Sequence, residues 1–115
     1  METLSSLTVA AALESMRAGK IFPQDLAEAC LRQIQRLNPT LNAFITINDM
    51  KPMPAVEPVA TAPATLKNVL RGIPIAVKDL FDTAGVRTTV GSKFFADNIP
   101  EQDAFVVEKL KQAGA

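Results

Sequence analysis

The sequence predicts an α/β fold in which two amino-terminal helices are followed by short strands and a further helix. Apolar residues recur at helical spacing through residues 8–37 and again through residues 103–113. Residues 73–77, in contrast, form a near-continuous apolar run of the length of a buried strand. A chain of 115 residues fits at most one domain, so residues 1–115 are treated as one unit.

Two helices are expected to open the chain as an antiparallel pair. Thr8 suits the N-cap of the first, which should end at Gly19 and present Val9, Ala12, Leu13 and Met16 on one face. Pro23 suits the first turn of the second, which Asn38 and Pro39 should stop. The apolar face of this second helix consists of Leu26, Ala29, Cys30, Ile34 and Leu37.

A short strand and a linker are expected next. Residues 41–47 have the aromatic and β-branched content of a strand, which would complete a first segment at residues 8–50. Prolines then interrupt residues 51–65 at positions 52, 54, 58 and 63, and they favour an extended, semi-rigid linker. The remaining segment, residues 66–115, should contain the main strand, a turn, a second strand and a helix.

Within residues 66–115, the strand at residues 73–77 leads directly into Lys78 and Asp79. A turn is expected from Asp82 to Gly85 and a short strand at residues 88–90. Asp103 suits the N-cap of the last helix, which should end at Gly114 and face inward through Val106, Val107, Leu110 and Ala113.

Lys78 is the candidate catalytic residue. A strand that enters the core would carry its amine out of water, and burial favours the neutral form that a general base needs. The alternative is that Lys78 and Asp79 form a solvated exit from the strand before the turn at residues 82–85.

The motifs around Lys78 resemble those of the amidase signature family. That family carries a GIPI-x-VKD segment, here Gly72 to Asp79, and then a G-x-x-TT-x-GS segment, here Gly85 to Ser92. The sequence is also similar to the family upstream, in NP-x-LNAF from Asn38 to Phe44, and downstream, in P-x-x-DA-x-x-V-x-x-L-x-x-AGA from Pro100 to Ala115. The alanine-rich helix usual in the family is replaced here by the proline-rich residues 51–65.

The resemblance implies the amino-terminal portion of a mixed-sheet amidase fold and a Ser, cis-Ser, Lys triad. Lys78 would be the base, acting through the cis-serine on a nucleophilic serine that attacks an amide carbonyl. Both triad serines follow the AGA helix in the family, whereas the serines present are Ser5, Ser6, Ser15 and Ser92. Ser92 is expected to be a turn or cap residue. The chain is therefore expected to be a partial amidase domain that is inactive alone.

Composition excludes several other classes of function. Twelve basic and twelve acidic residues cancel without a basic cluster, so no direct nucleic-acid binding is expected. With no histidine and one cysteine, Cys30, no metal or other cofactor is expected, and Cys30 is interpreted as a small buried hydrophobe. The first 16 residues fit neither a signal peptide nor a membrane span, which predicts a cytoplasmic protein.

Three functions stay open from the sequence. The first is an amidase that hydrolyses a carbon–nitrogen bond of a small-molecule amide, alone or as a homo-oligomer. The second is the amidase subunit of a tRNA amidotransferase, which would imply partner subunits. The third is a non-catalytic, truncated product that acts as an interaction module.

Overall fold

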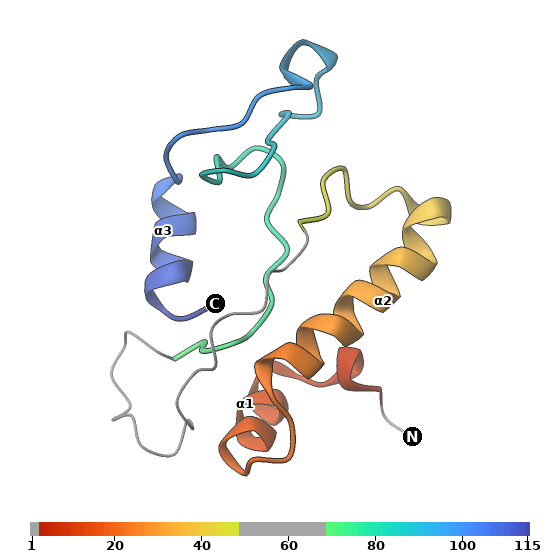
Figure 1. The fold of residues 1–115 in the computed structure, drawn as a ribbon, viewed down its shortest axis with the longest axis vertical. Coiled ribbons are helices and arrows are strands. Elements are labelled where there is room, and N and C mark those ends of the chain that lie inside the picture. Colours follow the sequence, from red (N-terminus) through yellow and green to blue (C-terminus); the bar gives the residue numbers. More distant parts are fainter. Residues whose placement is uncertain (1–2, 49–68) are drawn as a thin grey trace.

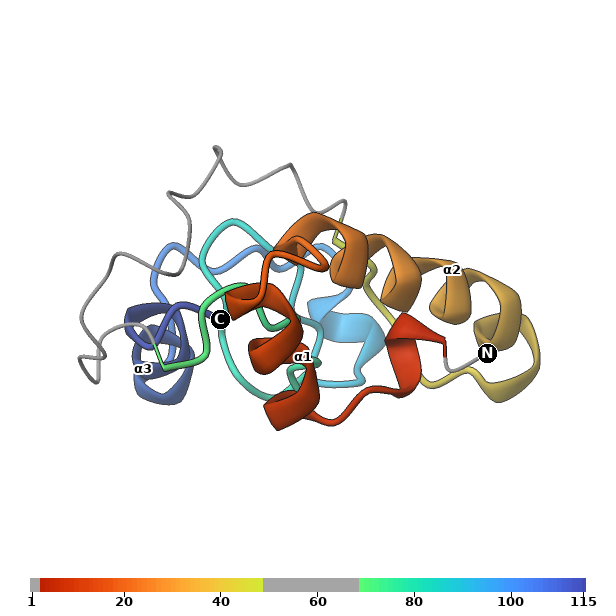
Figure 2. The same ribbon diagram turned by 90° about the horizontal axis from the view of Figure 1, so that it is seen from below.

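The computed structural model describes residues 3–48 and 69–115, so the linker predicted at residues 51–65 lies outside the described residues. The helices in the described part are η1 (Leu4–Ser6), α1 (Val9–Arg17), α2 (Pro23–Leu41), η4 (Lys93–Phe95) and α3 (Phe105–Gln112). The extended segment that begins at residue 69 runs between α3 on one side and α1 and α2 on the other (Figures 1 and 2).

Helix α1 forms as its sequence predicts. The Thr8 hydroxyl accepts a hydrogen bond from the Ala11 amide at 3.2 Å, which confirms Thr8 as the N-cap. Gly19 follows the helix with a φ of 67°, a conformation that glycine adopts without steric cost. Helix α2 begins at Pro23, and the Asp25 carboxylate of its first turn accepts from the Phe22 amide at 2.7 Å.

The prediction that Asn38 and Pro39 stop α2 is wrong, because the helix continues to Leu41. Pro39 lacks only one donor in the last turn, and the Asn42 amide still donates to the Asn38 carbonyl at 2.8 Å. The Asn38 side chain instead ties down the chain that follows the helix. Its amide group donates to the Phe44 carbonyl at 3.0 Å, and its oxygen accepts from the Phe44 amide at 2.8 Å.

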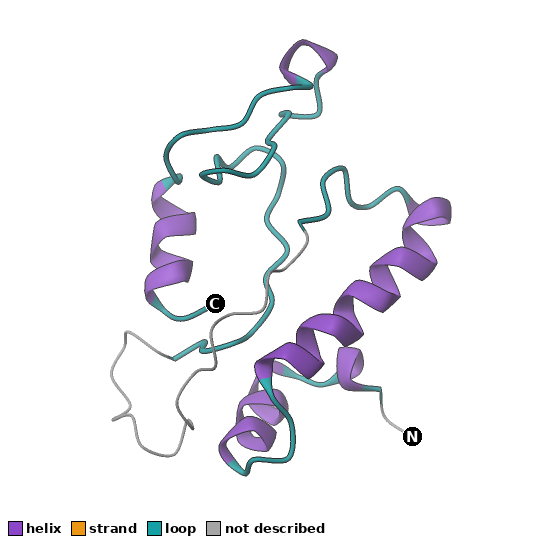
Figure 3. Ribbon diagram, viewed as in Figure 1, coloured by secondary structure: helices purple, strands orange, loops and turns teal. Residues whose placement is uncertain are grey.

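The described residues contain helices and loops but no β-strand (Figure 3). The strands predicted at residues 41–47, 73–77 and 88–90 are therefore wrong for this structure, and the only bridge in the described part joins Thr83 to Val86. A strand needs a neighbouring ladder, and the backbone before residue 74 pairs with the end of α3 instead. The Leu70 amide donates to the Ala113 carbonyl and the Gly72 amide to the Gly114 carbonyl, both at 2.8 Å.

One small core joins the two amino-terminal helices to the start of the extended segment. Ala12 and Met16 from α1, Leu26 from α2 and Ile73 are buried together. Gly72 brings the extended segment close to α2, because a Cβ built on it would lie 2.5 Å from Cγ of Pro23. Partly buried side chains surround this core: Leu4, Leu7, Leu13, Ile21 and Leu70. Cys30 is half-buried, and burial raises the pKa of its thiol.

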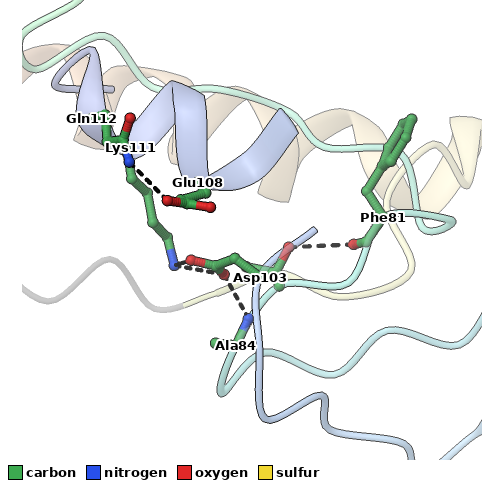
Figure 4. Close-up of polar contacts among 7 residues, drawn as sticks. Phe81, Ala84, Asp103, Glu108, Lys111 and Gln112 are labelled. Carbon is green, nitrogen blue, oxygen red and sulfur yellow. Dashed lines mark hydrogen bonds and ion pairs between the residues drawn. The ribbon is translucent and has the colours of Figure 1, made fainter. Parts of the chain in front are cut away.

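Helix α3 is anchored to the turn that precedes it (Figure 4). Asp103 is not the N-cap, as predicted, because the helix starts one residue later with Ala104 at that position. The Asp103 carboxylate accepts instead from the Ala84 amide at 2.8 Å and from the Lys111 amine at 2.7 Å. Val107 is buried as expected, whereas Val106 is 41% exposed, so its predicted inward orientation is wrong.

Candidate functional site

Lys78 lies at the end of the extended segment and at the start of a turn. The Phe81 amide donates to the Lys78 carbonyl at 3.0 Å, so Asp79 and Leu80 form the centre of this turn. The Lys78 side chain is exposed, as are Ile75 and Val77 before it. The prediction that a strand carries Lys78 into the core is therefore wrong for this structure, although Lys78 does follow an apolar, extended run.

Asp79 holds the next segment of the motif through three consecutive backbone amides. The Thr89 amide donates to one carboxylate oxygen at 2.8 Å, and the Gly91 amide donates to the other at 2.9 Å. Between them, the Val90 amide donates to the Asp79 main-chain carbonyl at 2.9 Å. The Thr89 hydroxyl adds a further hydrogen bond to the same carboxylate. We call this arrangement the Asp79 clasp.

The clasp closes a turn with unusual backbone geometry. The Ser92 amide donates to the Thr89 carbonyl at 2.9 Å, and the two central residues have positive φ angles, 55° at Val90 and 64° at Gly91. Two positive φ angles are typical of a type I′ turn, in which Asn-Gly is the favoured pair. A β-branched valine is costly in this left-handed region, so the contacts of Asp79 must hold Val90 there.

The hydrogen bonds of the clasp lower the pKa of Asp79. The Thr89 hydroxyl is the largest cause, followed by the Thr89 amide, with smaller contributions from the Gly91 amide and the positive charge of Arg87. Partial desolvation opposes this shift. The carboxylate is thus favoured in its charged form, which is the form that accepts all four donors.

A shallow hollow of about 210 Å³ lies beside the clasp. Arg87 spans it by donating to the Ala96 carbonyl at 3.3 Å and to the Ile45 carbonyl at 3.4 Å. Its lining residues are Ile45, Arg87, Thr89, Gly91, Ser92, Lys93 and Ala96. A larger hollow of about 380 Å³, between η1 and α2, is lined by Thr3, Leu4, Ser5, Ala29, Arg32, Gln33 and Arg36.

Ser92 caps the short helix η4, since its hydroxyl accepts from the Phe94 amide at 3.2 Å. This confirms the sequence interpretation of Ser92 as a cap residue. Among the hydrogen bonds of the described residues, none joins a serine hydroxyl to Lys78. The structure thus displays the predicted base but brings no serine of the described part to it.

Asp79 is the functional candidate to which sequence reasoning gave no role. The signal was present in the motif, because an acidic residue directly after the lysine faces a Thr-Thr-x-Gly segment rich in exposed amide donors. Across residues 3–48 and 69–115, no three histidine, cysteine or acidic side chains gather as metal ligands. No helix there combines the length and apolar character needed to cross a membrane.

The fold of the Lys78 region and its motifs define a class of protein that comparison with known sequences identifies. The sequence model of the Amidase family matches residues 25–115. Because this match covers most of the chain, the chain belongs to the Amidase family, as the amidase signature motifs predicted.

The similar proteins are glutamyl-tRNA(Gln) amidotransferase A subunits. The protein of that name from Granulibacter bethesdensis is 37% identical over all of this chain and 23% of its own length. The one from Azoarcus sp. is 48% identical over 79% of this chain and 19% of its own length. The chain thus spans about a quarter of the curated relatives that it matches. No solved structure matches it.

Proposed function

We propose that this chain provides the lysine-bearing part of the amidase subunit of a tRNA amidotransferase. The observation that carries this proposal is the similarity to amidotransferase A subunits along the whole chain, including the relative from Granulibacter bethesdensis. The reaction would be hydrolysis of an amide carbon–nitrogen bond, with release of ammonia for transfer.

Lys78 is the general base of this proposed reaction. It removes a proton, through a cis-serine, from a nucleophilic serine whose oxygen then attacks the amide carbonyl carbon. As the carbon–nitrogen bond breaks, the proton returns to the leaving nitrogen, and water later hydrolyses the acyl-serine. The exposed position of Lys78, directly after an extended run, leaves its amine free to meet such a serine.

The two serines of the proposed triad are contributed by residues other than these 115. Ser92 is engaged as the cap of η4, and Ser5 and Ser6 belong to η1. Ser15 lies in α1. The base would therefore work only together with further parts of an amidase domain, which agrees with the chain spanning about a quarter of its relatives.

Other protein chains are part of the proposal, since the name of the similar proteins makes each of them one component of a larger assembly. Direct binding of the tRNA would fall to another component, because the charges of this chain cancel. We place the protein in the cytoplasm on the basis of its amino-terminal sequence.

A free-standing amidase is the second candidate, and the family match at residues 25–115 is the observation that favours it. Such an enzyme would hydrolyse a small-molecule amide without partner subunits. Dependence of activity on the other amidotransferase subunits separates the two candidates.

The test uses a chimera in which this chain replaces the matching segment of the Granulibacter bethesdensis relative. Ammonia release from a panel of primary amides is measured with and without the partner subunits. Lys78→Ala should lower turnover by several orders of magnitude, because removing one member of a catalytic unit costs nearly as much as removing all. Lys78→Arg should fail as well, since a guanidinium does not release its proton near neutral pH.

Lys20→Ala is the matched control, because Lys20 is an exposed lysine just after α1 and far along the chain from the motif. It should keep the activity of the parent chimera within about twofold. An arginine variant at position 78 that retained most of the turnover would show that Lys78 is not the base.

A further inference from the structure

We infer that Asp79 is the positioning residue of the site, and that its clasp on Thr89, Val90 and Gly91 fixes the turn from which Lys78 projects. This inference rests on the proposed role of Lys78 as the base. It assigns to Asp79 an indirect role, since Asp79 holds the backbone on either side of the site and contacts no reacting atom.

The first support is the density of contacts at one residue. Asp79 accepts from three consecutive amides with both its carboxylate and its own carbonyl, at 2.8 to 2.9 Å. The backbone of Asp79 is thereby held at two points, its carbonyl and its side chain. Lys78 is the adjacent residue, and its carbonyl is held by the Phe81 amide. The Cα of Lys78 is thus fixed from both sides although its side chain lies in solvent.

The second support is the backbone conformation at Val90. A valine with a φ of 55° is an outlier, and such residues persist only where their surroundings impose the conformation. Thr88 and Thr89 on the preceding side are buried, at 4% and 5% exposure. A turn that needed only to reverse the chain would be served better by Asn-Gly, so the valine indicates that Asp79 imposes the shape.

The third support is the position of the clasp between Lys78 and the hollow of about 210 Å³. Thr89 and Gly91 both donate to Asp79 and both line this hollow. One carboxylate therefore sets the register between the residue that holds the base and the wall beside it. Misplacement of a catalytic group by about 1 Å can cost on the order of 100-fold in rate.

The first arm of the test compares Asp79→Asn with Asp97→Asn in the 115-residue chain. Asparagine offers one acceptor oxygen and turns an NH₂ group toward an amide donor, so the clasp loses at least one bond. Hydrogen exchange at the Gly91 amide should accelerate about tenfold or more in Asp79→Asn. It should not change in Asp97→Asn, because Asp97 is an exposed carboxylate of the same region. Equal exchange in the two variants would overturn the inference.

The second arm measures kinetics in the chimera with the Granulibacter bethesdensis relative. Asp79→Asn should lower kcat by on the order of 100-fold with KM within about twofold, because the base is misplaced while substrate binding is not. Adding Val90→Asn should restore kcat about tenfold, since asparagine holds the left-handed conformation without the clasp. A merely structural role would not produce this rescue.

The outcomes separate the inference from the proposed function. If Lys78→Ala keeps the activity of the chimera, the proposed function fails whatever Asp79 does. If Lys78→Ala is inactive while Asp79→Asn matches Asp97→Asn, only the positioning role fails. A loss of kcat in Asp79→Asn that Val90→Asn does not relieve also overturns the positioning role.

Discussion

Gly72 is the position at which one methyl group should do most damage to this fold. A Cβ added there would lie 2.5 Å from Cγ and 2.6 Å from Cβ of Pro23, at the first residue of α2. The φ of Gly72 is also positive, at 77°. The left-handed conformation costs an L-residue about 1–2 kcal/mol, and overpacking of this kind adds about 1–3 kcal/mol. Gly72→Ala should therefore lower the free energy of unfolding by about 2–5 kcal/mol.

Gly85→Ala is the matched control, because Gly85 has a similar φ of 73° but nothing within 4 Å of an added Cβ. Its cost should be the backbone term alone, about 1–2 kcal/mol. Both variants are compared by urea unfolding followed by circular dichroism, with trimethylamine oxide added to raise the stability of the compact state. The difference between the two variants then measures the contact with Pro23.

A double-mutant cycle completes this test. In a Pro23→Gly background only the Cα of residue 23 remains near the added methyl group, at 3.4 Å, which is ordinary contact. Gly72→Ala should there cost no more than Gly85→Ala. If Gly72→Ala and Gly85→Ala differ by less than about 0.5 kcal/mol in the unmodified chain, or the background changes nothing, the steric argument is refuted.

Three further predictions concern the isolated chain. It should release no ammonia from simple amides, because a base without a nucleophile offers no covalent route, and turnover lost on Lys78→Ala would contradict this. Because the clasp lowers the pKa of Asp79 below 3.8, its stabilisation should be complete above that pH and lost as the pH falls through the folded pKa. The NMR shift of the Gly91 amide should accordingly titrate with a midpoint below 3.8, and a midpoint above it would refute the clasp. The chain should also self-associate through exposed apolar side chains such as Phe94 and Phe105, which are 88% and 74% exposed. A monomer in size-exclusion chromatography with slow amide exchange across residues 73–80 would show a self-sufficient domain instead.

Local signals in the sequence predicted the helices well. Thr8 caps α1 and Pro23 starts α2, because a cap and a fixed φ act within one turn of the residue that provides them. The end of α2 was missed for a related reason. Asn38 and Pro39 were interpreted by propensity alone, whereas the Asn38 side chain is used to hold Phe44 six residues later.

The strands could not be predicted in the same way, because a strand exists only with a partner. Residues 73–77 have the right composition, but the hydrogen bonds nearest to them run from Leu70 and Gly72 to the end of α3. The candidate site shows the same division. Lys78 was identified by its motif, whereas the role of Asp79 depends on amides ten to twelve residues away, and single-sequence patterns do not specify such contacts.

Burial of the base and cover for the apolar run are, on this structure, one problem. A lysine acts as a general base only as the free amine, and removal of water favours that form. Ile75, Val77 and Leu80 around Lys78 are each at least 40% exposed, although an extended apolar run of this kind is typical of a buried position. A surface that packed on these side chains would exclude water from the neighbouring amine as well. Such packing would therefore complete the fold and activate the base in the same step, with the Asp79 clasp already holding the backbone in place.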